Sequence, residues 1–112
     1  MSDGRLPAHV EVSAMIRAVE AAGGFATVIA KGNREAGVIL VLTTDRGGAV
    51  RLWERMPRLD GTRPFSLVRT QTSEKDVDFS DYLARRTTRD PDSWIVELDI
   101  PDAERFVAEF GR

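Results

Sequence analysis

Three segments of the chain carry apolar residues at the three- and four-residue spacing of an amphipathic helix. The first extends over positions 12–22. We expect it to begin at Ser13, a favourable N-cap, or nearer Pro7, and to end at Gly23. The second follows Ser73, which has an acid three residues later as in a capping box, and should end near Thr88. The third is a short helix after Asp102 that ends at Gly111.

Alternating or continuous apolar residues predict strands between these helices. Residues 25–31 and 37–45 are apolar on both faces, which is typical of strands covered on both sides. Residues 49–56 alternate, with Val50, Leu52 and Met56 on one face. Trp94 to Ile100 alternates as well, whereas Phe65–Thr70 is a weaker pattern that leaves its strand assignment open.

The predicted order is helix, three or four strands, helix, strand, helix. Short links between the early strands favour antiparallel hairpins. We therefore predict an α+β fold: a mainly antiparallel sheet of four to five strands with two or three helices packed on it. Helices on both faces would make it a three-layer sandwich. With 112 residues, we expect one domain over 1–112, with residues 1–6 as a flexible tail.

Composition excludes several kinds of chemistry. The chain has no Cys and a single His, so thiolate nucleophiles, cysteine zinc sites and multi-histidine metal sites are excluded. A net charge of −2 argues against nucleic acid as a partner. The N-terminus lacks the basic start and apolar run of a signal peptide, and no apolar run approaches the roughly 20 residues that a membrane span needs. We expect a cytoplasmic protein without membrane association.

Several segments in order resemble a small bacterial family catalogued as domain of unknown function 1491. They are the helix opening at 12–14, the stretch 21–28, the turn 31–37, the segment 77–86 and its continuation over 90–99. Two positions depart from the family pattern: Asn33 stands where an acid is expected, and Pro101 follows the last strand. The family has no assigned activity, so the resemblance implies fold and compartment and leaves function open.

One candidate ligand-binding face is formed by Arg51, Trp53 and Arg55, which alternation places together on the third strand. Guanidinium groups suit phosphate or carboxylate, and an exposed indole between them can stack on a ring. The alternative, which we favour, is that a helix covers Trp53 and the arginine stems pack around it.

A second candidate is the acidic cluster of Asp90, Asp92, Glu97 and Asp99, which offers oxygen ligands for Mg²⁺ or an acid–base pair. The simpler interpretation is a solvated face with turn residues, neutralised by nearby arginines.

The Gly-flanked turn at 31–34 lacks the ending of a P-loop, which favours a structural turn. His9 stands near the N-terminus without a catalytic partner.

These observations favour a non-enzymatic binding or protein-interaction module without catalytic residues, resident metal or cofactor. The partner would be an unidentified protein or a second copy of the chain. Two alternatives stay open: binding of a small anion, nucleotide or nucleic acid at Trp53, and a carboxylate-based, Mg²⁺-dependent enzyme.

Overall fold

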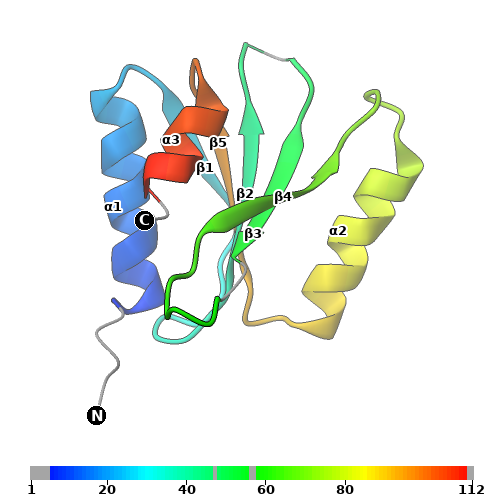
Figure 1. Ribbon diagram of the computed structural model, residues 1–112. Helices are drawn as coiled ribbons and strands as arrows, with labels where there is room; N and C mark the ends of the chain where they lie inside the picture. The colour runs from blue at the N-terminus through cyan, green and yellow to red at the C-terminus, as the bar shows by residue number, and fades with distance from the viewer. Residues whose placement is uncertain (1–5, 47, 56–57, 111–112) are drawn as a thin grey trace.

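A computed structural model describes residues 6–46, 48–55 and 58–110 (Figure 1). It contains a five-stranded sheet and three helices. In chain order the elements are α1 (Ala8–Ala21), β1 (Phe25–Ala30), β2 (Ile39–Thr44), β3 (Arg51–Arg55), β4 (Phe65–Thr70), α2 (Val77–Arg89), β5 (Trp94–Asp99) and α3 (Ala103–Phe110). The predicted α+β class is confirmed, and the weaker strand candidate is a strand with the bounds expected for it.

The sheet has the order β1-β5-β2-β3-β4. The pair β5–β2 is parallel, and the other three neighbouring pairs are antiparallel. The hairpins β2–β3 and β3–β4 are those that the short links predict. The expected hairpin between β1 and β2 is wrong, because β5 lies between them. This central position explains why β5 is buried on both faces over its first half.

Helices lie on both faces of the sheet and give three layers (Figure 1). On one face, α1 and α3 cover a large core cluster that includes Val12, Met15, Val96, Leu98 and Val107. On the other face, α2 covers a smaller cluster of Leu40, Leu42, Leu52, Phe79 and Ile95. The strand β2 supplies both clusters with alternate side chains, as its continuous apolar run predicts.

The two long helices begin in different ways. The helix α1 begins after Pro7, the second of the two predicted starts, and no side chain caps it. Its first amides, from Ala8 and His9, donate instead to the carbonyl oxygens of a loop at residues 34–35. The helix α2 is capped by Asp76, whose carboxylate accepts from the Phe79 amide, and not by Ser73.

The strand β1 is not covered on both faces as predicted. It is an edge strand, and alternate side chains along it are exposed. Within the predicted strand of residues 37–45, Val38 is 43% exposed and precedes β2. Residues 1–5 of the predicted tail, together with Met56 and Gly111, lie outside the described residues.

Candidate functional site

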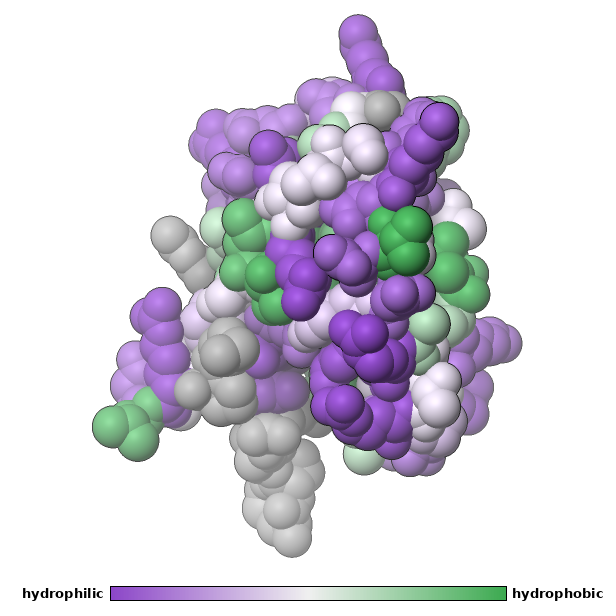
Figure 2. Space-filling view, turned by 90° about the vertical axis from the view of Figure 1, so that its right-hand side faces the viewer, coloured by the Kyte–Doolittle hydropathy of each residue, from purple (hydrophilic) through white to green (hydrophobic). Residues whose placement is uncertain are grey.

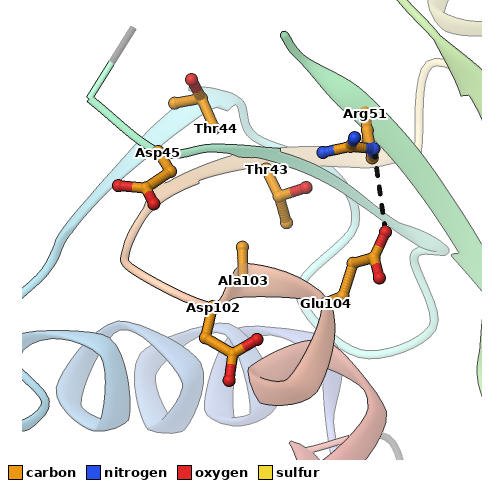
Figure 3. Close-up of a pocket in the computed structure, with 7 residues that line it drawn as sticks. All are labelled: Thr43, Thr44, Asp45, Arg51, Asp102, Ala103 and Glu104. Atoms are coloured by element: carbon orange, nitrogen blue, oxygen red, sulfur yellow. Dashed lines mark ion pairs between the residues drawn. The ribbon is translucent and has the colours of Figure 1, made fainter. Parts of the chain in front are cut away.

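A cavity of about 320 Å³ lies where the parallel strands β2 and β5 end, beside the first turn of α3 (Figure 3). Polar residues from β2, β3 and α3 form its wall. Its lining consists of Thr43, Thr44, Asp45, Arg51, Asp102, Ala103 and Glu104. Three carboxylates against one guanidinium group make the cavity acidic, which suits a small polar or positively charged group.

Four of the polar residues of this cavity have structural partners. The Thr43 hydroxyl accepts a 2.8 Å hydrogen bond from the Trp53 indole nitrogen. The Thr44 hydroxyl donates to the Gly48 carbonyl oxygen and holds the turn after β2. Arg51 Nε lies 3.8 Å from Glu104 Oε1, linking β3 to α3 (Figure 3). These contacts give structural roles to Thr43, Thr44, Arg51 and Glu104.

The three residues of the predicted arginine–tryptophan face lie on the sheet face that α1 and α3 cover. Trp53 is only 9% exposed and belongs to the core, so its ring is not available for stacking. The favoured alternative, a covered indole, is what the structure has. Arg55 is paired through two guanidinium nitrogens with the Glu11 carboxylate of α1, and its guanidinium carbon lies 4.7 Å from the Phe65 ring centre. Anion binding by Arg51 stays a prediction.

The structure does not bring the four predicted acids together. Asp90 and Asp92 precede β5, where Asp90 accepts a hydrogen bond from the Asp92 amide. Glu97 and Asp99 lie at the other end of the strand, and Asp99 accepts from the Arg46 amide. In the part of the chain that the structure describes, no three His, Cys, Asp or Glu side chains are grouped so that they could hold a metal ion.

The glycine-flanked turn is a packing site between the α2–β5 loop and the start of α1. A methyl group on Gly32 or Gly37 would overlap the Asp92 carbonyl oxygen. The Asn33 side-chain oxygen accepts hydrogen bonds from two backbone amides of its own turn. The Asn33 backbone carbonyl oxygen accepts one from the Trp94 indole. Asn33 therefore has the turn-forming hydrogen bonds that an acid at this position would also accept.

A polar cluster between β3 and α2 was not singled out from the sequence. The Glu54 carboxylate accepts 2.9 Å hydrogen bonds from the Tyr82 hydroxyl and from Arg86, and the Arg69 guanidinium carbon lies 4.4 Å from the Tyr82 ring centre. Burial, followed by the hydrogen bond to Glu54, raises the pKa of the Tyr82 hydroxyl. The sequence indicates this cluster only through Glu54, an acid that alternation places on the same side of β3 as the core residue Leu52. These contacts hold α2 against strands β3 and β4 of the sheet.

One region of the sheet is left without a helix on the α2 side. Phe25 pairs with Asp99, and Thr27 pairs with Glu97. Directly paired residues share a face, and Glu97 and Asp99 alternate in step with Ile95, which lies beneath α2. We call Phe25, Thr27, Glu97 and Asp99 the open face.

The open face is the place where an apolar ring is most exposed within the sheet. Phe25 is 75% exposed, and Ile29, further along the same strand, is 54% exposed. The cluster under α2 includes Ile95 and Ala30 but none of the four open-face residues. Figure 2 shows the α2 side of the molecule, where polar side chains dominate and apolar ones gather in small separate groups. The sequence pattern of β1 indicated burial on this face. The pattern could not show that β1 lies at the edge of the sheet, where no helix covers it.

The fold and these sites define a three-layer α+β domain with a mixed sheet and no recognisable catalytic constellation among its described residues. Over residues 6–108, the chain matches the model of a family described as "Protein of unknown function (DUF1491)". The protein belongs to this family, as the sequence resemblance indicates. No match is found among curated proteins.

Solved structures of similar proteins support this assignment. The crystal structure of a DUF1491 family protein from Caulobacter crescentus CB15 is 38% identical, with a TM-score of 0.77, and the match covers 91% of this chain and 94% of that one. An NMR structure of a DUF1491 family protein from the same organism is 39% identical, with a TM-score of 0.74 and coverage of 91% and 92%. The solution structure of a protein from A. tumefaciens is 30% identical, with a TM-score of 0.73 and coverage of 93% of both chains.

Among the described residues, no helix combines the length and apolar character that crossing a membrane requires. Membership of a family of unknown function agrees with the expectation of an uncharacterised domain.

Proposed function

We propose that the protein is a non-enzymatic protein-interaction module that binds its partner through the open face. The observation that carries this proposal is the 75% exposure of Phe25 within the sheet. Removing an exposed aromatic side chain from water contributes about 1.5–3 kcal/mol, and buried aromatic residues are frequent anchors of protein interfaces. No packing or hydrogen-bonding role of the ring inside the described chain explains its position, whereas the two threonines and the Arg51–Glu104 pair of the cavity beside α3 have structural roles.

Side-chain docking fits this surface better than addition of a strand to the sheet edge. The register of β1 against β5 shifts between Val28 and Ala30, so a bulge interrupts this edge. The other edge strand, β4, also has a register shift, opposite Leu52 and Trp53. Bulges at edges disfavour pairing with another strand. The partner is therefore expected to contact side chains on the open face and not the backbone of an edge.

The test compares the native protein with a Phe25→Ser variant in extracts of the cells that naturally produce it. We expect the native chain to elute in gel filtration well above its own mass of 12.4 kDa, and the Phe25→Ser chain to elute as the free protein. Leu59→Ser is the matched control, because Leu59 is fully exposed in a turn outside the sheet.

Thermal melts of both purified variants establish that they fold. Elution of the native chain at its own mass, or of the Phe25→Ser chain together with the native one, would contradict the proposal.

A further inference from the structure

We propose that the occupant of the open face is a basic amphipathic helix of a partner protein, lying beside α2 on the same side of the sheet. This inference rests on the proposed function and adds the chemistry of the partner. It follows from the charge of the surface, from its width and from the spacing of its side chains.

The charge of the open face selects a positively charged partner. Its two titratable residues, Glu97 and Asp99, are both acids on one strand and both partly exposed. Within the described residues, neither forms a salt bridge with a basic side chain. Asp99 accepts a hydrogen bond from the Arg46 amide, which leaves its second carboxylate oxygen for a partner. Two carboxylates beside an exposed ring suit a partner segment in which an apolar residue packs on the ring and flanking Lys or Arg side chains pair with the carboxylates.

The same charges disfavour a second copy of this chain. Two open faces placed together would bring four carboxylates into one interface, and like charges at close range cost several kcal/mol. The chain as a whole carries a net charge of −2, which adds to the repulsion. A basic partner removes this cost and gains from both acids.

The width of the open region fits one helix. It is formed by two neighbouring strands, β1 and β5, which lie about 4.8 Å apart, and the sheet ends at β1. A helix with its side chains is about 10 Å across. The helix α2 contacts Glu54 of β3 and Arg69 of β4 and packs over Leu40 and Leu42 of β2. A second helix beside it would complete this layer.

The spacing of the acids also fits a helix. Residues two apart on a strand are about 6.5–7 Å apart. On a helix, residues at i and i+4 rise by about 6 Å on one side. Basic residues at that spacing can reach Glu97 and Asp99 together. An apolar residue of the same helix then covers Phe25, which lies directly opposite Asp99.

The test measures binding of two fluorescein-labelled helical peptides by fluorescence anisotropy. One is an 18-residue peptide (roughly five turns) of leucine and lysine with its apolar residues at i, i+3, i+4 and i+7. The other has glutamate in place of every lysine. We expect the lysine peptide to bind the native protein and the glutamate peptide not to bind. Amide shifts in NMR spectra should concentrate on β1 and the end of β5.

The matched variants separate site recognition from general charge attraction. Glu97→Gln with Asp99→Asn should weaken binding of the lysine peptide about tenfold or more, while the asparagine oxygen still accepts from the Arg46 amide. The control, Glu74→Gln with Asp81→Asn, removes the same charge from exposed positions before and within α2 and should change binding less than about twofold.

Failure of this inference can be told apart from failure of the proposed function. No binding of the lysine peptide, or equal weakening by both double variants, would overturn the basic helix. If Phe25→Ser still removes the chain from its native complex, the interaction function stands with a different partner chemistry. If Phe25→Ser leaves that complex intact, the proposed function fails as well.

Discussion

At the scale of single residues, the turn at positions 31–37 shows how glycine can serve packing where the sequence also suggests an anion cradle. Gly32 lets the turn approach the Asp92 backbone, and the Asn33 amide donates to the Asp92 carbonyl oxygen at 2.8 Å. The Trp94 indole donates to the Asn33 carbonyl oxygen at 2.8 Å. Side chains larger than hydrogen at position 32 are incompatible with these contacts. The turn is therefore a structural joint between the α2–β5 loop and the start of α1.

We expect Gly32→Ala to lower the free energy of unfolding by about 2–3 kcal/mol, the upper range for overpacking. The added methyl group overlaps a backbone carbonyl, which cannot swing away as a flexible side chain can. For a domain of this size the melting temperature should fall by roughly 10 °C, measured by circular dichroism. Gly48→Ala is the matched control, because its methyl group would stay 3.1 Å from its nearest neighbour, the Asp45 carbonyl oxygen. Equal melting temperatures for the two variants would contradict this role.

At the scale of elements, each helix start depends on a different kind of contact. The start of α2 is local: Asp76 caps it and also accepts from the amide and hydroxyl of Thr72. These hydrogen bonds, with the Thr72 amide first and the Phe79 amide next, hold the pKa of the Asp76 carboxyl below its ordinary 3.8. The start of α1 depends instead on a loop some 25 positions away, to which His9 also bonds through its ring nitrogen.

Replacing Asp76 by Ala should therefore have an effect that depends on pH. Because the pKa of Asp76 is lower in the folded than in the unfolded state, its carboxylate stabilises the fold at any pH above the unfolded-state pKa. This stabilisation is lost as the pH falls through the folded-state pKa. We expect Asp76→Ala to melt several degrees below the native protein at pH 7. The gap in melting temperature should narrow as the pH falls below the ordinary pKa of 3.8 and through the lower pKa of the folded state.

The measurement is thermal unfolding of both proteins at neutral and acidic pH. Asp78→Ala, which removes another carboxylate from the same helical turn, is the control. A gap of constant size across this pH range would show that the Asp76 charge does not act through these hydrogen bonds.

At the scale of the whole molecule, the sheet separates two hydrophobic cores, and one region of the sheet has no helix over it. Leu40 and Val41 are adjacent in sequence and fully buried, but they belong to opposite cores. The helices supply the rest of each core. Because α2 covers only part of its side, the layer that contains it has room beside it, and that is where the open face lies.

The double burial of β2 predicts a contrast between two substitutions in the same segment. Leu40→Asp would place a carboxylate without a partner under α2, at a cost of several kcal/mol, which threatens a domain with a stability of about 5–15 kcal/mol. Val38→Asp, two positions earlier, adds the same charge to a 43% exposed residue and should change the melting temperature little. A soluble Leu40→Asp protein with the native melting temperature would contradict the three-layer arrangement.

Periodicity along the chain was enough to predict the kinds of element and their approximate places. The helix over Ala103–Phe110, the strand that begins at Trp94 and the alternation of Arg51, Leu52 and Trp53 all follow from the period of apolar residues within a short segment. Turn residues and proline add their own local constraints on backbone conformation. These properties are set over a few residues, so a single sequence contains them.

Contacts between distant segments decided the rest. The insertion of β5 between β1 and β2 turned the doubly apolar pattern of β1 into an edge strand with Phe25 in solvent. The covering of one sheet face by α1 and α3 buried Trp53 and so decided between the two interpretations of this strand, in favour of the covered indole. The antiparallel pairing of β5 with β1 placed Glu97 beside Thr27. Periodicity shows that a side chain alternates from face to face, but only packing determines which face a helix covers, because that choice depends on the area that all the elements bury together.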